Sequence, residues 1–189
     1  MEPTTSDEEQ IKVMTLEAFA DTIVPGNKRW PGDRAVAGVS HDGGAVAAGA
    51  VELLESPAGG LSLYLPILAA MLNGHAREYA GEQGIELDDS VPAFVSLDYD
   101  HRAALVLRLT AGDHPERQGW VNLAMFSTMS FDSGAHLHTV DALAGGHPGL
   151  LTLGFRPPDA DGLWRFPDYT YGRQLAEIHP ATTASGSPA

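Results

Sequence analysis

Histidines are the residues of this sequence whose type and number point most directly to chemistry, because the chain has eight of them and no cysteine. His136 and His138 form the tightest pair. In a helix, residues two apart lie about 200° apart and cannot bind one ion, whereas an extended segment would let them converge with a third ligand. His138 with Asp141, and Asp98 with His101, have the i, i+3 spacing that places two ligands on one helical face. The Glu-x-x-His motif that would complete a bundle-type site is absent, so we expect solvated or capping histidines and no metal ligand.

Other catalytic signatures are missing as well. The lack of cysteine excludes disulfides, thiolate metal sites, iron–sulfur clusters and cysteine nucleophiles. No Gly-x-Ser-x-Gly or Ser-x-x-Lys motif marks a serine nucleophile, and no glycine-rich phosphate loop marks a site for FAD, NAD or ATP. The paired carboxylates Glu8-Glu9 and Asp88-Asp89 lie in polar surroundings typical of solvated surface charge. The sequence therefore predicts no catalytic residue and no cofactor in this chain.

Aromatic residues crowd the C-terminal third, in the segment 157-PPDADGLWRFPDYTYG-172. Tyrosine and tryptophan are favoured at binding interfaces, so this segment is a candidate for contact with another protein through Trp164, Phe166, Tyr169 and Tyr171. The alternative is that these side chains cover the chain's own helical core. A second candidate surface is the loop PGNKRWPGDR, where Trp30 lies among several of the few cations of the chain.

Size and charge limit the classes of partner. The chain has 189 residues, 43% of them hydrophobic, and a formal net charge of −14, which suits one acidic globular domain. Such a charge repels phosphate backbones and anionic lipid, so we expect neither nucleic acid nor a membrane as partner. No apolar run approaches the roughly 18–20 residues that span a bilayer. The acidic start MEPTTSDEEQ also lacks the basic and apolar regions of an export signal, which predicts a cytoplasmic protein.

The elements that would position these residues are helices, because the long apolar patterns repeat with a period near 3.6 residues. We expect an all-α fold: a single irregular helical domain over residues 9–180 with about five or six helices and a long Pro/aromatic-rich C-terminal segment, flanked by a flexible N-terminus (1–8) and a disordered tail (181–189). Asp98 is suited to cap one helix, and Asp113-x-x-Glu116 has the spacing of a capping box for the next. The predicted helices cover residues 9–24, 35–54 with an interruption at Gly43-Gly44, 61–75, 98–109, 115–130 and 135–144.

Three segments are similar to a known family. The segment 15-TLEAFADTIVPGNKRWPGDRAVAGV-39 resembles the opening of the gluconate 2-dehydrogenase subunit 3 family, in which a helix ends in a Val-Pro-Gly turn and a second Pro-Gly precedes a Gly-Val helix start. Phe94-x-x-Leu97 followed by a helix over residues 102–109 resembles the mid-chain helix of that family. The stretch 154-GFRPP-158 with Tyr171-Gly172 is similar to its C-terminal region.

The resemblance implies an α-helical, non-catalytic small subunit that binds and stabilises a larger oxidoreductase of the glucose-methanol-choline type. The larger subunit would carry the FAD and the chemistry, acting on a sugar or a secondary-metabolite alcohol. Two features depart from the family: the twin-arginine export signal is absent, and the late block reads DADGLWRFPDYTYG in place of a glycine- and asparagine-rich stretch. The alternative hypothesis is a stand-alone helical enzyme in which a His-containing pocket, with or without a metal, acts on a small hydrophobic substrate.

Overall fold

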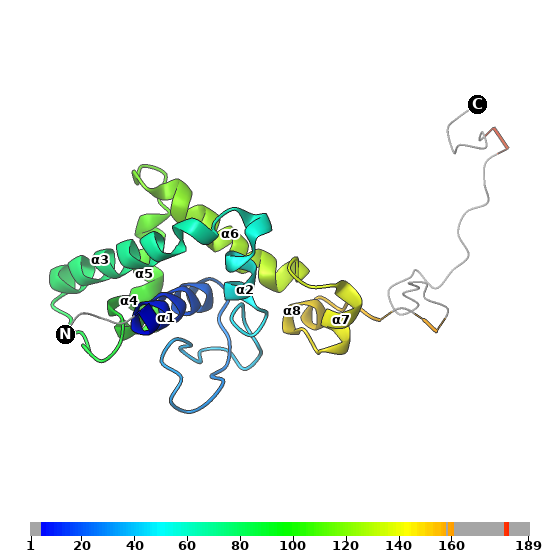
Figure 1. Ribbon diagram of the computed structural model, residues 1–189, viewed down its shortest axis with the longest axis horizontal. Helices are drawn as coiled ribbons and strands as arrows, with labels where there is room; N and C mark the ends of the chain where they lie inside the picture. The colour runs from blue at the N-terminus through cyan, green and yellow to red at the C-terminus, as the bar shows by residue number, and fades with distance from the viewer. Residues whose placement is uncertain (1–4, 158, 161–179, 182–189) are drawn as a thin grey trace. The chain divides into compact units, whose positions relative to one another are not determined.

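A computed structural model describes residues 5–157, 159–160 and 180–181 of the chain. Within these residues the fold is entirely helical, with eight α-helices, two short 3-10 helices and no strand (Figure 1). The predicted all-α class is confirmed. Residues 1–155 form one compact unit, and residues 156–189 form a second unit of which few residues are described. No helix in the described part is both long and apolar enough to cross a bilayer.

Four long helices form the frame of the compact unit, and the other four have six residues or fewer. These short helices raise the number observed in the described residues above the five or six expected. In chain order the elements, with η marking a 3-10 helix, are α1 (Thr5–Ile23), α2 (Ala50–Glu55), η1 (Pro57–Gly59), η2 (Ser62–Tyr64), α3 (Leu65–Gln83), α4 (Ala93–Ser96), α5 (Tyr99–Leu109), α6 (Arg117–Ser133), α7 (Thr139–Ala144) and α8 (Pro148–Thr152).

The core is built around α1, which packs against α2, α3, α4, α5 and α6. The apolar stripe predicted on this helix is buried, with Leu16 and Phe19 fully inaccessible. The ring of Phe19 lies 6.4 Å from that of Phe94 and 6.5 Å from that of Trp120, measured between centroids. These aromatic contacts join α1 to α4 and α6 and bring the N-terminus of α6 close to the middle of the unit.

Local signals set several helix ends. Asp98 caps α5 as predicted, because its carboxylate accepts a hydrogen bond from the backbone N–H of His101 at 2.9 Å. The predicted helix over 61–75 begins as η2 and continues as α3 well past His75. It ends only at Gly84, whose φ of 68° is in the left-handed region that glycine adopts without strain.

The helix predicted over residues 35–54 is wrong for most of its length, since only α2 is helical. Residues 24–49 form a loop because buried side chains take up its backbone groups. Asp21 accepts the N–H groups of Gly26 at 2.9 Å and Ala37 at 2.8 Å. Gly44 packs so closely on the Pro25-Gly26 turn that an added Cβ atom would clash with the carbonyl oxygen of Val24. Gly44 thus permits contact between two loop backbones and does not interrupt a helix as predicted.

The last helices also begin later than predicted. The helix expected over 135–144 starts only at Thr139, and a further short helix, α8, follows it. The helix expected over 115–130 starts at Arg117, and Glu116, at its N-cap position, makes no side-chain capping bond. The proposed capping box Asp113-x-x-Glu116 is therefore wrong, because the Glu116 carboxylate bonds to other side chains.

Candidate functional site

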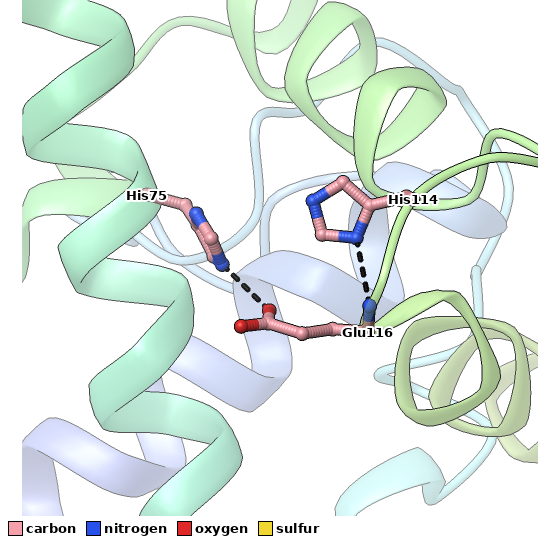
Figure 2. Close-up of side chains that lie close together, drawn as sticks. All are labelled: His75, His114 and Glu116. Atoms are coloured by element: carbon pink, nitrogen blue, oxygen red, sulfur yellow. Dashed lines mark hydrogen bonds and ion pairs between the residues drawn. The ribbon is translucent and has the colours of Figure 1, made fainter.

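His75, His114 and Glu116 come together at one place on the compact unit, although His75 lies about 40 positions before the other two in the sequence. His75 is on α3, His114 is in the loop between α5 and α6, and Glu116 directly precedes α6. Each offers one ligand atom, and the three atoms lie within 4.8 Å of one another. Figure 2 shows the carboxylate of Glu116 directed at His75, and the ring of His114 facing His75 across the Glu116 side chain. We call this group the His75–His114–Glu116 cluster.

Glu116 is the centre of the cluster. One of its carboxylate oxygens, Oε2, accepts hydrogen bonds from Nε2 of His75 at 2.8 Å and from the indole N–H of Trp120 at 3.2 Å. Trp120 is fully buried, so it holds the carboxylate in a defined orientation. The hydrogen bond from His75 is the largest cause of a lowered pKa at Glu116, and Trp120 adds to it. Glu116 is therefore an ionised carboxylate at neutral pH.

The two imidazoles are held by contacts on both sides. The His75 ring packs edge-on against Trp120, with 5.8 Å between centroids, and against His114 at the same distance. The second nitrogen of His75, Nδ1, lies 3.9 Å from a carboxylate oxygen of Glu78. Nδ1 of His114 accepts the backbone N–H of Glu116 at 3.2 Å, and its other ring nitrogen lies on the edge that faces His75 (Figure 2). Each ring thus has one nitrogen toward the cluster and one toward another polar group.

Two imidazoles and a carboxylate are the donors that zinc takes in catalytic sites, where three protein ligands leave one position open. A metal bound to Nδ1 of His114 would take the place of the Glu116 N–H directly. A metal bound to Nε2 would leave the ring proton on Nδ1, which could then no longer accept that N–H. That loss costs about 1 kcal/mol, whereas binding with even a micromolar dissociation constant supplies about 8 kcal/mol. The hydrogen bonds now present therefore do not prevent metal binding.

A second polar cluster is buried and serves the fold. Arg102, 3% exposed, donates hydrogen bonds to the backbone carbonyl oxygens of Leu97, Val95, Ala35 and Arg34 at 2.6–3.1 Å. Burial lowers the pKa of Arg102 to about 10, so the guanidinium stays charged at neutral pH. Burial also raises the pKa of the nearby Asp21, an effect that its backbone N–H partners oppose. Arg102 and Asp21 together join the loop after α1 to the start of α5.

The predicted contact residue Trp30 is on the surface of that loop and is 53% exposed. The guanidinium of Arg29 lies 4.7 Å from the centroid of its ring. Arg29 is itself held by Asp33, at 2.7 Å from Nε to Oδ2, and by both carboxylate oxygens of Glu17. Trp30 is thus an exposed aromatic side chain on an anchored loop.

The other predicted residues lie elsewhere. Trp164, Phe166, Tyr169 and Tyr171 fall outside the described residues. The histidines with metal-ligand spacing in the sequence are not part of the His75–His114–Glu116 cluster. His138 is exposed, and its Nδ1 lies 3.9 Å from a carboxylate oxygen of Asp141. Nδ1 of His101 shares a 3.1 Å hydrogen bond with the Tyr79 hydroxyl. His136 lines a cavity of about 660 Å³ together with His147.

Sequence reasoning missed the cluster itself. His75 fits the end of the predicted helix over 61–75, and Glu116 has the spacing of a capping box, so each residue has a local explanation. The one local signal is His114-x-Glu116 at the start of a helix, which places two donors near each other, but nothing in the spacing pairs them with a residue of α3.

A comparison with known protein families matches residues 10–189. The chain belongs to DUF5987, described as a family of unknown function. The matched range includes the cluster, the Trp30 loop and the C-terminal aromatic segment. No curated protein and no solved structure matches the chain.

Proposed function

We propose that this chain is a non-catalytic helical subunit that binds and stabilises an FAD-dependent oxidoreductase of the glucose-methanol-choline type, acting on a sugar or a secondary-metabolite alcohol. The identity of the partner rests on the resemblance to the gluconate 2-dehydrogenase subunit 3 family. The observation that carries the binding role is the exposed Trp30 on an anchored loop.

Trp30 has the properties of an interface anchor. Tryptophan is enriched among the residues that dominate binding energy, and an anchor held in place before binding loses less conformational entropy. Asp33, which is buried, holds the loop on both sides of Trp30 through the Arg29 side chain and the backbone N–H of Val36. Val39, on the same loop, is also exposed. The loop therefore presents apolar surface in a defined conformation.

Buried polar contacts join the first and the mid-chain segments that carry the resemblance, which supports a subunit without catalytic residues of its own. Arg102, from the mid-chain segment, bonds to the carbonyls of Arg34 and Ala35 in the first segment. Asp21 bonds to the Val-Pro-Gly turn. Arg102 and Asp21 are thus engaged with backbone groups and are not free to act on a substrate.

The test is co-expression of the full chain with a glucose-methanol-choline type oxidoreductase from the same genome, a neighbouring gene being the first choice, followed by affinity purification through this chain. We expect a flavin absorbance band in the purified complex. Trp30→Ala should weaken the complex at least tenfold, since truncating an anchor costs about 2 kcal/mol or more and 1.4 kcal/mol is already tenfold in affinity. Trp164→Ala tests the C-terminal segment in the same way.

Leu107→Ala is the matched control, because Leu107 is an exposed apolar residue of α5 outside the Trp30 loop. Purification of the wild-type chain without any flavoprotein would contradict the proposed function. Retention of the flavoprotein by both Trp30→Ala and Trp164→Ala would contradict the proposed interface.

A second candidate, a stand-alone enzyme with a His-containing pocket, is favoured by one observation. The cavity of about 660 Å³ lined by His136, His147 and Glu52 is in the size range of small-molecule sites. Nδ1 of His136 and Nε2 of His147 are buried and have no hydrogen-bond partner among the described residues, and burial lowers the pKa of His136. A thermal-shift screen of the isolated chain against small alcohols, aldehydes and carboxylic acids, repeated with His136→Ala, tests this candidate.

A further inference from the structure

We propose that His75, His114 and Glu116 form a binding site for a single divalent transition metal, with zinc as the ion that best fits the donor set. This inference does not depend on the partner proposed above. It rests on the side chains of the cluster, on the groups that orient them and on their access to solvent.

The donor types select the class of ion. Calcium and magnesium prefer sites built from oxygen ligands, and this cluster offers a single carboxylate. Two imidazole nitrogens and one carboxylate suit zinc, which binds nitrogen ligands at about 2.0–2.1 Å and carboxylate oxygens at about 2.0–2.2 Å. Copper and nickel also bind imidazole, but zinc accepts a tetrahedral set of three protein ligands and one water without a preference imposed by d electrons.

The ligand atoms are already near the required spacing. Tetrahedral zinc ligands lie about 3.4 Å from one another. Nε2 of His75 and Oε2 of Glu116 are 2.8 Å apart, and no pair in the cluster exceeds 4.8 Å. The metal would replace the proton that His75 and Glu116 now share. The remaining adjustment is a side-chain movement on the order of 1 Å by His114, which is on a loop.

Second-layer groups are present on two of the ligands. Metal-bound histidines usually donate their other ring N–H to a carboxylate or carbonyl, which fixes the tautomer. When Nε2 of His75 binds the metal, Nδ1 carries the proton, and the Glu78 carboxylate lies 3.9 Å from it. Trp120 holds Glu116 through its indole N–H. The Trp120 bond orients Glu116 in this structure, whereas the exposed Glu78 side chain must move closer before it can accept the Nδ1 proton of His75.

Solvent reaches the cluster, so an ion can enter and keep a water molecule. The side chains of His75 and Glu116 are 24% and 37% exposed. Three protein ligands with an accessible fourth position is the arrangement of a catalytic or exchangeable zinc site, in contrast to the closed four-ligand arrangement of structural zinc.

Zinc titration of the tag-free full chain, after treatment with a chelator and dialysis, tests the site. A chromogenic chelator in competition reports the affinity, and Co²⁺ gives an independent visible spectrum of the coordination geometry. We expect one equivalent bound with a micromolar or tighter dissociation constant. His75→Ala, His114→Ala and Glu116→Gln should each weaken binding by at least about 10-fold, because loss of even an outer-layer partner costs 10–100-fold.

His138→Ala is the matched control, because His138 is a histidine outside the cluster whose side chain is 74% exposed; this variant should bind zinc like the wild type. Circular dichroism checks the fold of every variant. If His75→Ala does not fold, the loop variant His114→Ala decides. The proposal would be overturned if the wild type bound no zinc at a free zinc concentration 100-fold above micromolar. It would also be overturned if both His114→Ala and Glu116→Gln bound zinc as tightly as the wild type.

Discussion

Asp21 and Arg102 hold the loop after α1 through backbone groups, whereas His75, His114 and Glu116 hold the loop before α6 mainly through one another. Arg102 is 3% exposed and contacts four carbonyl oxygens. His75 and Glu116 are partly exposed and share one short hydrogen bond. A buried polar group bonded to backbone has no capacity left for a ligand, while side chains that bond to each other at the surface can exchange that bond for an ion. Asp21 and Arg102 therefore stabilise the fold, and the His75–His114–Glu116 cluster is the candidate site.

The largest effect is expected at Arg102. Arg102→Ala would leave several carbonyl oxygens buried without a donor, at a cost of about 3 kcal/mol or more in the free energy of unfolding. Urea denaturation measures this loss. Arg108→Ala is the control, because Arg108 makes an exposed ion pair with Glu82, a type worth less than about 1 kcal/mol. Its guanidinium also lies 4.7 Å from the centroid of the Tyr79 ring, a contact worth about 0.5–1 kcal/mol at an exposed site. Equal losses in the free energy of unfolding for the two substitutions would show that the buried Arg102 contributes no more to stability than the surface Arg108.

The second effect concerns the contact between loop backbones at Gly44. Gly44→Ala should destabilise the fold by about 2 kcal/mol, because the new Cβ atom would clash with the Val24 carbonyl and force the Pro25-Gly26 turn to move. Gly81→Ala in α3 is the matched control. Nothing lies within 4 Å of a Cβ atom at Gly81, so there alanine should stabilise the helix by about 0.5–1 kcal/mol. Thermal unfolding of both variants measures the opposite signs.

A smaller effect, the stabilisation of the fold by zinc, tests the His75–His114–Glu116 cluster. Zinc at ten times its dissociation constant should raise the stability of the wild type by about 1.4 kcal/mol, or roughly 3–6 °C in Tm for a chain of this size. His114→Ala should show no such shift. Differential scanning fluorimetry is sufficient, and an equal zinc-induced shift in the variant would place the ion elsewhere.

The smallest effect is a pH dependence at Asp33. Burial alone would raise the pKa of Asp33, but hydrogen bonds from the Arg29 side chain and the Val36 backbone outweigh it and lower the pKa below 3.8. The unfolded chain then takes up a proton at higher pH than the folded chain, so Asp33 stabilises the fold above about pH 4, and this contribution is lost as pH falls toward the folded-state pKa.

Asp33→Asn removes this pH-dependent term. The stability difference between wild type and variant should therefore narrow as the pH falls from 5 to 3, as measured by urea denaturation at each pH. Asp132→Asn, at an exposed position of α6, serves as the control. If the stability difference between wild type and Asp33→Asn widened toward pH 3, the stabilising effect of Asp33 would not depend on its ionised form.

The long helices could be predicted from sequence because their signals are local. The apolar stripe with Leu16 and Phe19 and the cap at Asp98 involve residues within one or two turns of each other. The loop over residues 24–49 could not be predicted, because its shape depends on Arg102, which lies 67 residues from its partner Ala35. The alanines of that loop favour a helix locally, and the hydrogen bonds from Arg102 and Asp21 to the loop backbone override the preference.

The candidate site also depends on contacts between segments that are distant in sequence. Glu116 has the type and spacing of a capping residue, and His75 follows the helical period of its neighbours, so each has a sufficient local explanation. The packing of α3 against the start of α6 puts the two side chains 2.8 Å apart, across 41 positions of sequence.

The sequence by itself determined the helical class, the acidic charge, the absence of cysteine chemistry, the end of α1 and both ends of α5, because all of these follow from composition or from contacts within a few residues. Tertiary structure alone decided that residues 35–49 form a loop, that Arg102 is buried against backbone carbonyls, and that two histidines and a glutamate converge beside Trp120. The physical reason is that hydrogen bonds between distant segments form only when the core brings those segments together, and the energy of such bonds exceeds the local preferences that a sequence pattern records.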